Sequence, residues 1–164
     1  MSLREMIEEM AKDAKRASGF LRKVERARKD AALELMASRL LEREEIIRKE
    51  NEKDLSEARK MGLSPAMIDR LTLDGKTIRS MADALKDVVA LPDPVGEVTG
   101  LLKRPNGLMV GRVRIPLGVI GFIYESRPNV TVEAASLCLK SGNAVILKGG
   151  SEAIHSNLIL AEVL

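Results

Sequence analysis

The sequence predicts an α/β fold in which a helical amino-terminal region is followed by a β-hairpin and then by the start of a parallel sheet. Two short apolar runs, at 119–124 and 144–147, are rich in β-branched residues and too short to be buried helices. Between them, apolar residues recur at helical spacing over about 130–140. Two apolar strands joined by one helix form a βαβ unit, whose strands run parallel in a buried sheet.

The first 95 residues are predicted to be helical. A capping box formed by Ser2 and Glu5 opens the first helix, and Gly19 is expected to end it. A second helix is indicated across 33–41, where apolar residues recur at the spacing of one helix face. The first helix also carries an apolar stripe, made of Met6, Ile7, Met10, Ala14 and Ala17.

Three further helices are expected before residue 91. The third runs from about 42 to 60, with Gly62 in the left-handed position that often follows a helix. Ser64 and Pro65 suit the N-cap and the first position of a short fourth helix. Asp74 is expected to cap a fifth helix, whose inward face comprises Ile78, Met81, Leu85, Val88 and Val89.

A β-hairpin is expected after the helices. The runs 97–103 and 108–115 favour strands, and Asn106-Gly107 between them is a strong turn signal. The apolar side chains of these runs cannot all be covered within a two-stranded ribbon. We therefore expect the hairpin to contact another subunit or another part of the protein.

The end of the chain suggests that the sequence is truncated. After the second apolar strand, Gly150 or Ser151 is expected to cap a helix that continues to residue 164 without a stop signal. A doubly wound sheet also needs further strands. The predicted organisation is a helical region at 1–95, a hairpin at 96–115, and the first part of a dinucleotide-binding domain at 116–164.

Composition favours a cytoplasmic protein that binds neither nucleic acid nor membranes. The formal net charge is only +3, and the charges of both signs in residues 1–95 are interpreted as solvent-exposed helix faces. A single cysteine excludes an intramolecular disulfide. No apolar run approaches the roughly 20 residues that cross a bilayer, and the amino terminus lacks the apolar segment of a secretory signal.

Lys148-Gly149-Gly150-Ser151 is the strongest candidate for a binding site. These residues follow the second strand, and open α/β sheets bind ligands at the carboxyl ends of their strands. Glycine lets the backbone approach a ligand, a helix start favours anions, and lysine adds a positive charge. The residues alone are equally consistent with an ordinary strand-to-helix turn that has a surface lysine.

Several segments resemble a known family. P-L-G-V-I-G-F-I at 116–123 and S-G-N-A-V-I-L-K-G-G-S-E at 141–152 resemble the start of the cofactor domain in the aldehyde dehydrogenase superfamily. Y-E-S-R-P-N-V-T-V-E-A-A at 124–135 is more specific and resembles the gamma-glutamyl phosphate reductase family within it. N-E-K-D-L at 51–55 and L-P-D-P-V-G-E-V at 91–98 agree, as does L-T-L-D, which follows Arg70.

The resemblance implies an aldehyde-dehydrogenase-like fold and an NADPH-dependent enzyme of proline biosynthesis. Such an enzyme reduces L-glutamyl 5-phosphate, a small-molecule substrate, to L-glutamate 5-semialdehyde. The family's nucleophilic cysteine comes from a motif that this chain lacks, so the chain alone is expected to be inactive. The resemblance also implies a homo-oligomer in which the hairpin helps to join subunits.

The resemblance assigns roles to individual residues. It implies that Lys148 reaches the adenosine ribose of NADP(H) and that Asn129 stabilises an oxyanion, although a shift of the alignment puts Arg127 in that place. Asn129 is equally suited to cap the following helix. Arg127, with Glu125, is a candidate for binding the anionic substrate. A neutral Ser151 favours NADPH, but the superfamily more often has Lys-Pro-Ser-Glu, and a one-residue shift would bring Glu152 there and reverse the preference.

Two other reactive residues are interpreted as structural. Cys138 lies on an apolar helix face and is expected in the core. His155 has no metal-ligand partner at useful spacing, so no metal site is predicted and a helix-surface position is expected. Two alternative functions stay open from the sequence, namely a helical interaction module formed by residues 1–95 and an aldehyde dehydrogenase that acts on a free aldehyde.

Overall fold

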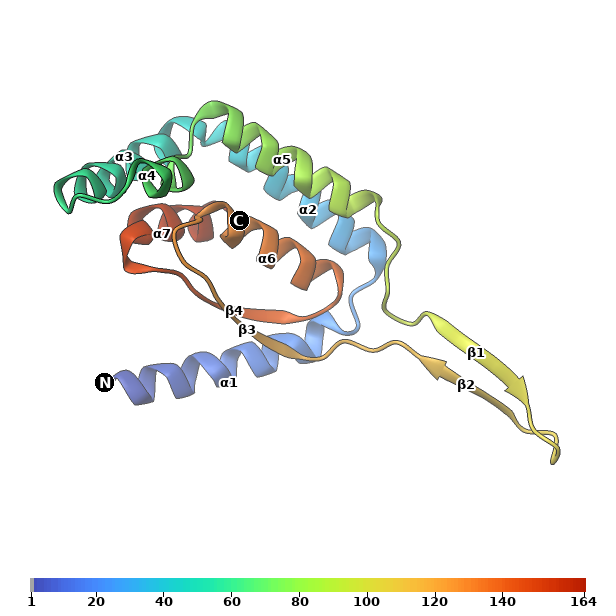
Figure 1. Ribbon diagram of the computed structural model, residues 1–164. Helices are drawn as coiled ribbons and strands as arrows, with labels where there is room; N and C mark the ends of the chain where they lie inside the picture. The colour runs from blue at the N-terminus through green and yellow to red at the C-terminus, as the bar shows by residue number, and fades with distance from the viewer. Residues whose placement is uncertain (1) are drawn as a thin grey trace.

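A computed structural model describes residues 2–164, as shown in Figure 1. The helical region contains α1 (Leu3–Leu21), α2 (Arg26–Glu42), α3 (Glu44–Lys60), α4 (Pro65–Leu71) and α5 (Gly75–Ala90). The hairpin strands are β1 (Val98–Lys103) and β2 (Met109–Val113). They are followed by β3 (Val119–Ile123), α6 (Asn129–Lys140), β4 (Ala144–Lys148), a 3-10 turn (Ser151–Ala153) and α7 (Ile154–Val163).

The helices pack in layers on the β3–β4 pair. α6 contacts β4 and also α5 and α2, whereas α1 contacts β4 and β3. In Figure 1, α1 and α6 lie on opposite sides of the two strands, and α2 and α5 form an outer layer beyond α6. α7 lies beside α6 and packs against α3. The helical region is therefore in direct contact with the βαβ unit.

One hydrophobic core joins the helical region to the βαβ unit. Leu33 and Leu40 of α2 and Ile78 of α5 are fully buried, and Val132 of α6 and Leu160 of α7 belong to the same cluster. Burying a side chain of this size contributes about 1.5–3 kcal/mol. These contacts hold α6 and α7, which begin next to the candidate binding loops, in fixed positions.

Three predicted helix caps and one predicted helix end are confirmed. Ser2 and Glu5 form the capping box of α1. The side chains of Ser64 and Asp74 accept hydrogen bonds from backbone N–H groups at the starts of α4 and α5. Gly62, which follows α3, has a φ of 70°. Each cap satisfies a donor that the first helical turn leaves unpaired, so short-range sequence signals fix these helix starts.

The predicted end of α1 is wrong. The helix continues through Gly19 to Leu21, and the N–H of Arg22 donates to the carbonyl of Ser18, which is buried. Glycine is only about 1 kcal/mol less favourable than alanine within a helix, which is too little by itself to end the helix at Gly19. The apolar stripe of α1 is partly uncovered, because the first half of the helix extends beyond the two strands (Figure 1). Met6, Ile7 and Met10 of this stripe are 41%, 53% and 45% exposed.

The parallel pairing of β3 and β4 is confirmed, with Val119 opposite Ala144 and Ile123 opposite Lys148. The prediction of a buried sheet is wrong for this pair. Only Ala144 among the ten strand residues is buried, and Ile123 is 75% exposed. A two-stranded sheet has two open edges, and α1 and α6 cover only part of its faces.

The hairpin is confirmed as an antiparallel pair that turns at Asn106-Gly107. It projects away from the other elements in Figure 1, and every residue of both strands except Thr99 is exposed. Its apolar side chains include Leu101 and Leu102, which are 57% and 59% exposed. The expected contact with another subunit or another part of the protein stays a prediction.

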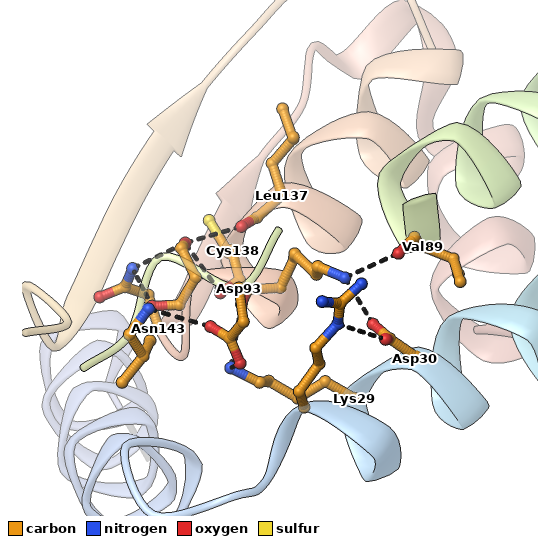
Figure 2. Close-up of polar contacts among 11 residues, drawn as sticks. Lys29, Asp30, Val89, Asp93, Leu137, Cys138 and Asn143 are labelled. Carbon is orange, nitrogen blue, oxygen red and sulfur yellow. Dashed lines mark hydrogen bonds and ion pairs between the residues drawn. The ribbon is translucent and has the colours of Figure 1, made fainter. Parts of the chain in front are cut away.

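Several charged side chains are buried between helices, which corrects the expectation that the charges of residues 1–95 lie on solvent-exposed helix faces. Lys29 of α2 is 1% exposed and pairs with Asp93 at 2.5 Å, while Lys140 of α6 is 2% exposed and pairs with Asp30 at 2.5 Å. Lys29 also donates to the carbonyl of Lys140 at 3.1 Å, and Lys140 donates to that of Val89 at 2.9 Å. Figure 2 shows these contacts, which tie α2, α5 and α6 to the linker that leads to the hairpin.

We expect the stability that Asp30 contributes to be lost in acid. Partial burial opposes ionisation, but hydrogen bonds from Lys140 and Arg26 and their positive charges outweigh it and lower the pKa of Asp30 below its ordinary value of 3.8. A depressed folded-state pKa stabilises the protein above the unfolded-state pKa, and this contribution disappears as the pH falls through the folded-state value. Urea unfolding at pH 6 and pH 3 should show a smaller loss of stability for Asp30→Asn than for the unsubstituted chain; equal losses would contradict this.

Candidate functional site

Two loops begin at the carboxyl ends of β3 and β4, on the same side of the strand pair. The N–H of Tyr124 donates to the carbonyl of Lys148 at 3.0 Å, directly after the last register pair of the two strands. The loops that follow each strand therefore start side by side at the carboxyl ends of parallel strands. Open α/β sheets bind their ligands at the carboxyl ends of their strands.

Lys148 and Ser151 offer free polar groups at the carboxyl end of β4. Both side chains are exposed, and no hydrogen bond or ion pair engages either of them within residues 2–164. An ammonium group and a hydroxyl are suitable donors for a phosphate or a ribose. The donor set therefore fits the phosphate and ribose groups of a dinucleotide.

The two glycines between them make room for side chains of the chain itself. A Cβ atom on Gly149 would collide with the amide nitrogen of Asn157 and would lie 3.3 Å from the ring of Tyr124. A Cβ atom on Gly150 would collide with the carboxylate of Glu152. The sequence suggested that these glycines admit a ligand, and the structure shows close neighbours from the chain itself at both positions.

A polar network lies beneath the loop. The hydroxyl groups of Tyr124 and Thr131 are 2.5 Å apart, and the Thr131 hydroxyl donates to the Asn157 side chain at 3.2 Å. The network connects the end of β3, the first turn of α6 and α7. Asn157 in turn packs against Gly149, so the network supports the backbone that presents Lys148. Sequence reasoning missed these residues, because no motif marks hydroxyl and amide groups 26 residues apart.

The amides at the start of α7 already have an anionic partner. The carboxylate of Asp54 accepts hydrogen bonds from the N–H groups of His155 and Ser156 at 3.1 and 2.8 Å, and from the Ser156 hydroxyl at 2.6 Å. The expectation that Gly150 or Ser151 caps a continuous helix is wrong in part. A 3-10 turn comes first, with Gly150 at its N-cap and no side-chain cap, because Asp54 supplies the cap of α7 from another helix.

Arg127 and Asn129 lie in the loop after β3 and at the start of α6. Arg127 is exposed, and the Asn129 side chain donates to Glu133 at 2.8 Å. Pro128 holds the N-cap position and Asn129 is the first helical residue, so the alternative role of Asn129 as the helix cap is wrong. One N–H of the Asn129 amide stays free to donate to a ligand.

Cys138 is in the core, as predicted. Its side chain is 6% exposed, and burial raises the pKa of its thiol. A buried thiol that stays protonated at neutral pH is a poor nucleophile. His155 is half-buried, with Nδ1 3.9 Å from a carboxylate oxygen of Glu50. Within residues 2–164, no group of three or more His, Cys, Asp or Glu side chains is placed to hold a metal ion.

We therefore expect the thiol of Cys138 to contribute packing and no chemistry. The thiol of the folded chain should therefore react with a thiol reagent at least about 100-fold more slowly than the thiol of the urea-unfolded chain. A thiol that reacts as fast in the folded chain as in the unfolded chain would contradict this expectation.

Helices long and apolar enough to span a membrane are absent from the part of the chain that the structure describes.

Comparison with known proteins identifies the class of the chain. No family model matches it. The solved structure of an NAD-dependent benzaldehyde dehydrogenase from Corynebacterium glutamicum superposes with a TM-score of 0.70 at 22% identity, covering 92% of this chain and 30% of that one. At this identity the match shows the fold alone, and the fold is aldehyde-dehydrogenase-like.

More particularly, this chain corresponds over its whole length to a portion of the gamma-glutamyl phosphate reductases. It is 59% identical over all 164 residues to the gamma-glutamyl phosphate reductase of Geobacter sp. (strain M21), and it covers 39% of that protein. The crystal structure of the Thermotoga maritima gamma-glutamyl phosphate reductase matches with a TM-score of 0.91 and 44% identity, over 94% of this chain and 37% of that one. The resemblance seen in the sequence is thereby confirmed.

Proposed function

We propose that this chain supplies the amino-terminal part of a cytoplasmic, homo-oligomeric enzyme that uses NADPH to reduce L-glutamyl 5-phosphate to L-glutamate 5-semialdehyde. The observation that carries the proposal is an alignment over all 164 residues, at 59% identity, with a gamma-glutamyl phosphate reductase. The proposed division of labour gives the first part of the dinucleotide-binding domain to residues 116–164 and contacts between subunits to the hairpin.

The proposal assigns roles to the two loops that follow β3 and β4. NADPH, when bound, supplies the hydride. Lys148 and Ser151 are proposed to hold its adenosine half, with the positive charge of Lys148 favouring a 2′-phosphate. Arg127 is proposed to bind an anionic group of the substrate, and Asn129 to donate an N–H to the developing oxyanion. The nucleophile is proposed to come from another part of the enzyme, because Cys138 is buried.

A hybrid enzyme tests the proposal. This chain would replace the aligned residues of the Geobacter relative, and oxidation of glutamate 5-semialdehyde by NADP in the presence of phosphate would be followed by the appearance of NADPH. We expect the hybrid to turn over within about tenfold of the intact relative, since most of the replaced residues are identical. A hybrid that folds, as judged by its melting temperature, but has no activity would refute the proposal, as would one that oxidises only unrelated free aldehydes.

Lys148→Ala in this hybrid should weaken NADPH binding about ten- to a hundredfold and NADH binding much less. A lysine contact to a phosphate is charge-assisted, and only NADPH carries the 2′-phosphate. Fluorescence titration of both cofactors measures the two dissociation constants. Lys12→Ala, at an exposed position on α1, is the matched control and should change neither. Equal losses for the two cofactors would mean that Lys148 does not recognise the 2′-phosphate.

A further inference from the structure

A single carboxylate joins the two loops that follow β3 and β4. Glu152, in the turn after β4, accepts hydrogen bonds through Oε1 from the Ser126 N–H at 2.5 Å and from the Ser126 hydroxyl at 2.9 Å. Ser126 lies in the loop after β3. In the part of the chain that the structure describes, these two bonds are the only side-chain hydrogen bonds that join residues 125–128 to residues 149–153.

Ser126 has a backbone conformation that needs support. Its φ is 50°, and it is the one non-glycine residue with a positive φ in the described part of the chain. Residues with a Cβ rarely adopt this conformation and keep it only when their surroundings hold them. Glu152 supplies that restraint by accepting hydrogen bonds from both donors of Ser126, its N–H and its hydroxyl, and the next residue along the chain is Arg127.

Glu152 is charged in this position. Partial burial opposes ionisation, but hydrogen bonds from its own N–H, from the Ser126 N–H and from the Ser126 hydroxyl, together with the charge of Lys148, lower the pKa of Glu152. A charged acceptor forms stronger hydrogen bonds than a neutral one. The Ser126–Glu152 contact is therefore a strong one at neutral pH.

Gly150 provides the space that Glu152 occupies. Its φ of −71° and ψ of 154° suit any residue, so backbone conformation does not require glycine here. A Cβ atom at this position would instead collide with the Glu152 carboxylate, which is the mobile end of a side chain. Alanine at position 150 should therefore displace the carboxylate and leave the backbone in place.

We propose that Glu152 is a positioning residue. Through Ser126, it holds the loop that carries Arg127 in fixed register with the loop that carries Lys148. The inference rests on the proposed function, in which Arg127 binds the substrate and Lys148 binds the cofactor. Its consequence is that loss of the contact weakens substrate binding, although neither Glu152 nor Ser126 has to touch the substrate.

Kinetics of the hybrid enzyme test the inference. Glu152→Ala should raise the KM for glutamate 5-semialdehyde about tenfold, as expected for loss of a charge-assisted hydrogen bond, and should change the Kd of NADPH less than about threefold. Ser126→Gly keeps the N–H and suits a positive φ, so it should raise the KM by a smaller factor. A contact with a merely structural role would lower the melting temperature and leave the KM of the folded enzyme unchanged, which would overturn the inference.

A double substitution tests whether Gly150 acts only by making room for Glu152. Gly150→Ala alone should raise the KM as Glu152→Ala does. If glycine only makes room for the carboxylate, the double variant Gly150→Ala/Glu152→Ala should be no worse than Glu152→Ala alone. Multiplied effects on the KM in the double variant would contradict the proposal and indicate that Gly150 acts independently.

The controls distinguish failure of the inference from failure of the proposed function. Glu162→Ala, at an exposed glutamate of α7, should change neither the KM nor the Kd. An inactive but folded unsubstituted hybrid would refute the proposed function. An active hybrid whose KM stays within about twofold after Glu152→Ala would refute the positioning role alone.

Discussion

Replacement of Asp54 by alanine is expected to lower the free energy of unfolding of this chain by about 3–4 kcal/mol. Asp54 is 1% exposed, and its carboxylate accepts three hydrogen bonds at the start of α7. Removing it leaves the buried donors of Ser156 without their partner and removes the negative charge that favours the amino-terminal end of a helix. Urea unfolding followed by circular dichroism measures the effect.

Two further variants show whether the effect comes from the carboxylate. Asp54→Asn keeps one acceptor oxygen and should cost roughly half as much as alanine. Glu57→Ala changes an exposed residue one turn further along α3 and should stay within about 0.5 kcal/mol of the unsubstituted chain. If Asp54→Ala were as stable as Glu57→Ala, α7 would not depend on this cap.

The order and type of the elements could be predicted because local signals determine them. Ser64, Asp74 and Gly62 act within one turn of the helix they start or follow, and an Asn-Gly turn fixes its own hairpin. The βαβ unit follows from the contrast between short apolar runs and helical spacing. None of these inferences requires knowledge of which distant segments meet.

Burial could not be predicted where it depends on distant segments. Lys29 and Asp54 look like members of mixed-charge helix faces, and each is buried because it meets a partner from another element, as is Lys140 at the end of α6. The stripe of α1 shows the opposite case, since a regular apolar pattern stays exposed where no element lies against it. Periodicity shows that a face is apolar but does not show what covers it.

The candidate site was predictable in its place and not in its construction. The order of strand, helix and strand was enough to place the loop of Lys148 beside the loop that follows β3, at the carboxyl ends of the two parallel strands. The sequence gives no sign that Glu152 turns toward Ser126, or that Asn157 and Glu152 fill the space beside two glycines. The contact of Glu152 with Ser126 goes with a left-handed backbone at Ser126, which residue type alone does not predict.

Lys29→Met is the second substitution expected to have a large effect, with a loss of about 3–5 kcal/mol in the free energy of unfolding. The side chain of Lys29 is 1% exposed and that of Asp93 is 14% exposed, and the two pair at 2.5 Å (Figure 2). Methionine has a similar length but no charge, so Asp93 would stay largely buried without its cation. The carbonyl of Lys140 would also lose a donor, which weakens the junction of α2 and α6.

A double-mutant cycle shows whether Lys29 and Asp93 act as a pair. Asp93→Asn leaves the Lys29 ammonium buried without a negative charge and should also destabilise the chain, while its side-chain oxygen can still accept from the N–H of Val95. Lys29→Met/Asp93→Asn removes both charges, so we expect it to be more stable than the sum of the single losses predicts by at least about 1 kcal/mol. Urea unfolding of the four proteins gives this coupling energy. Additive losses would contradict the pairing and would mean that Lys29 stabilises the chain through its aliphatic stem and its bond to the Lys140 carbonyl.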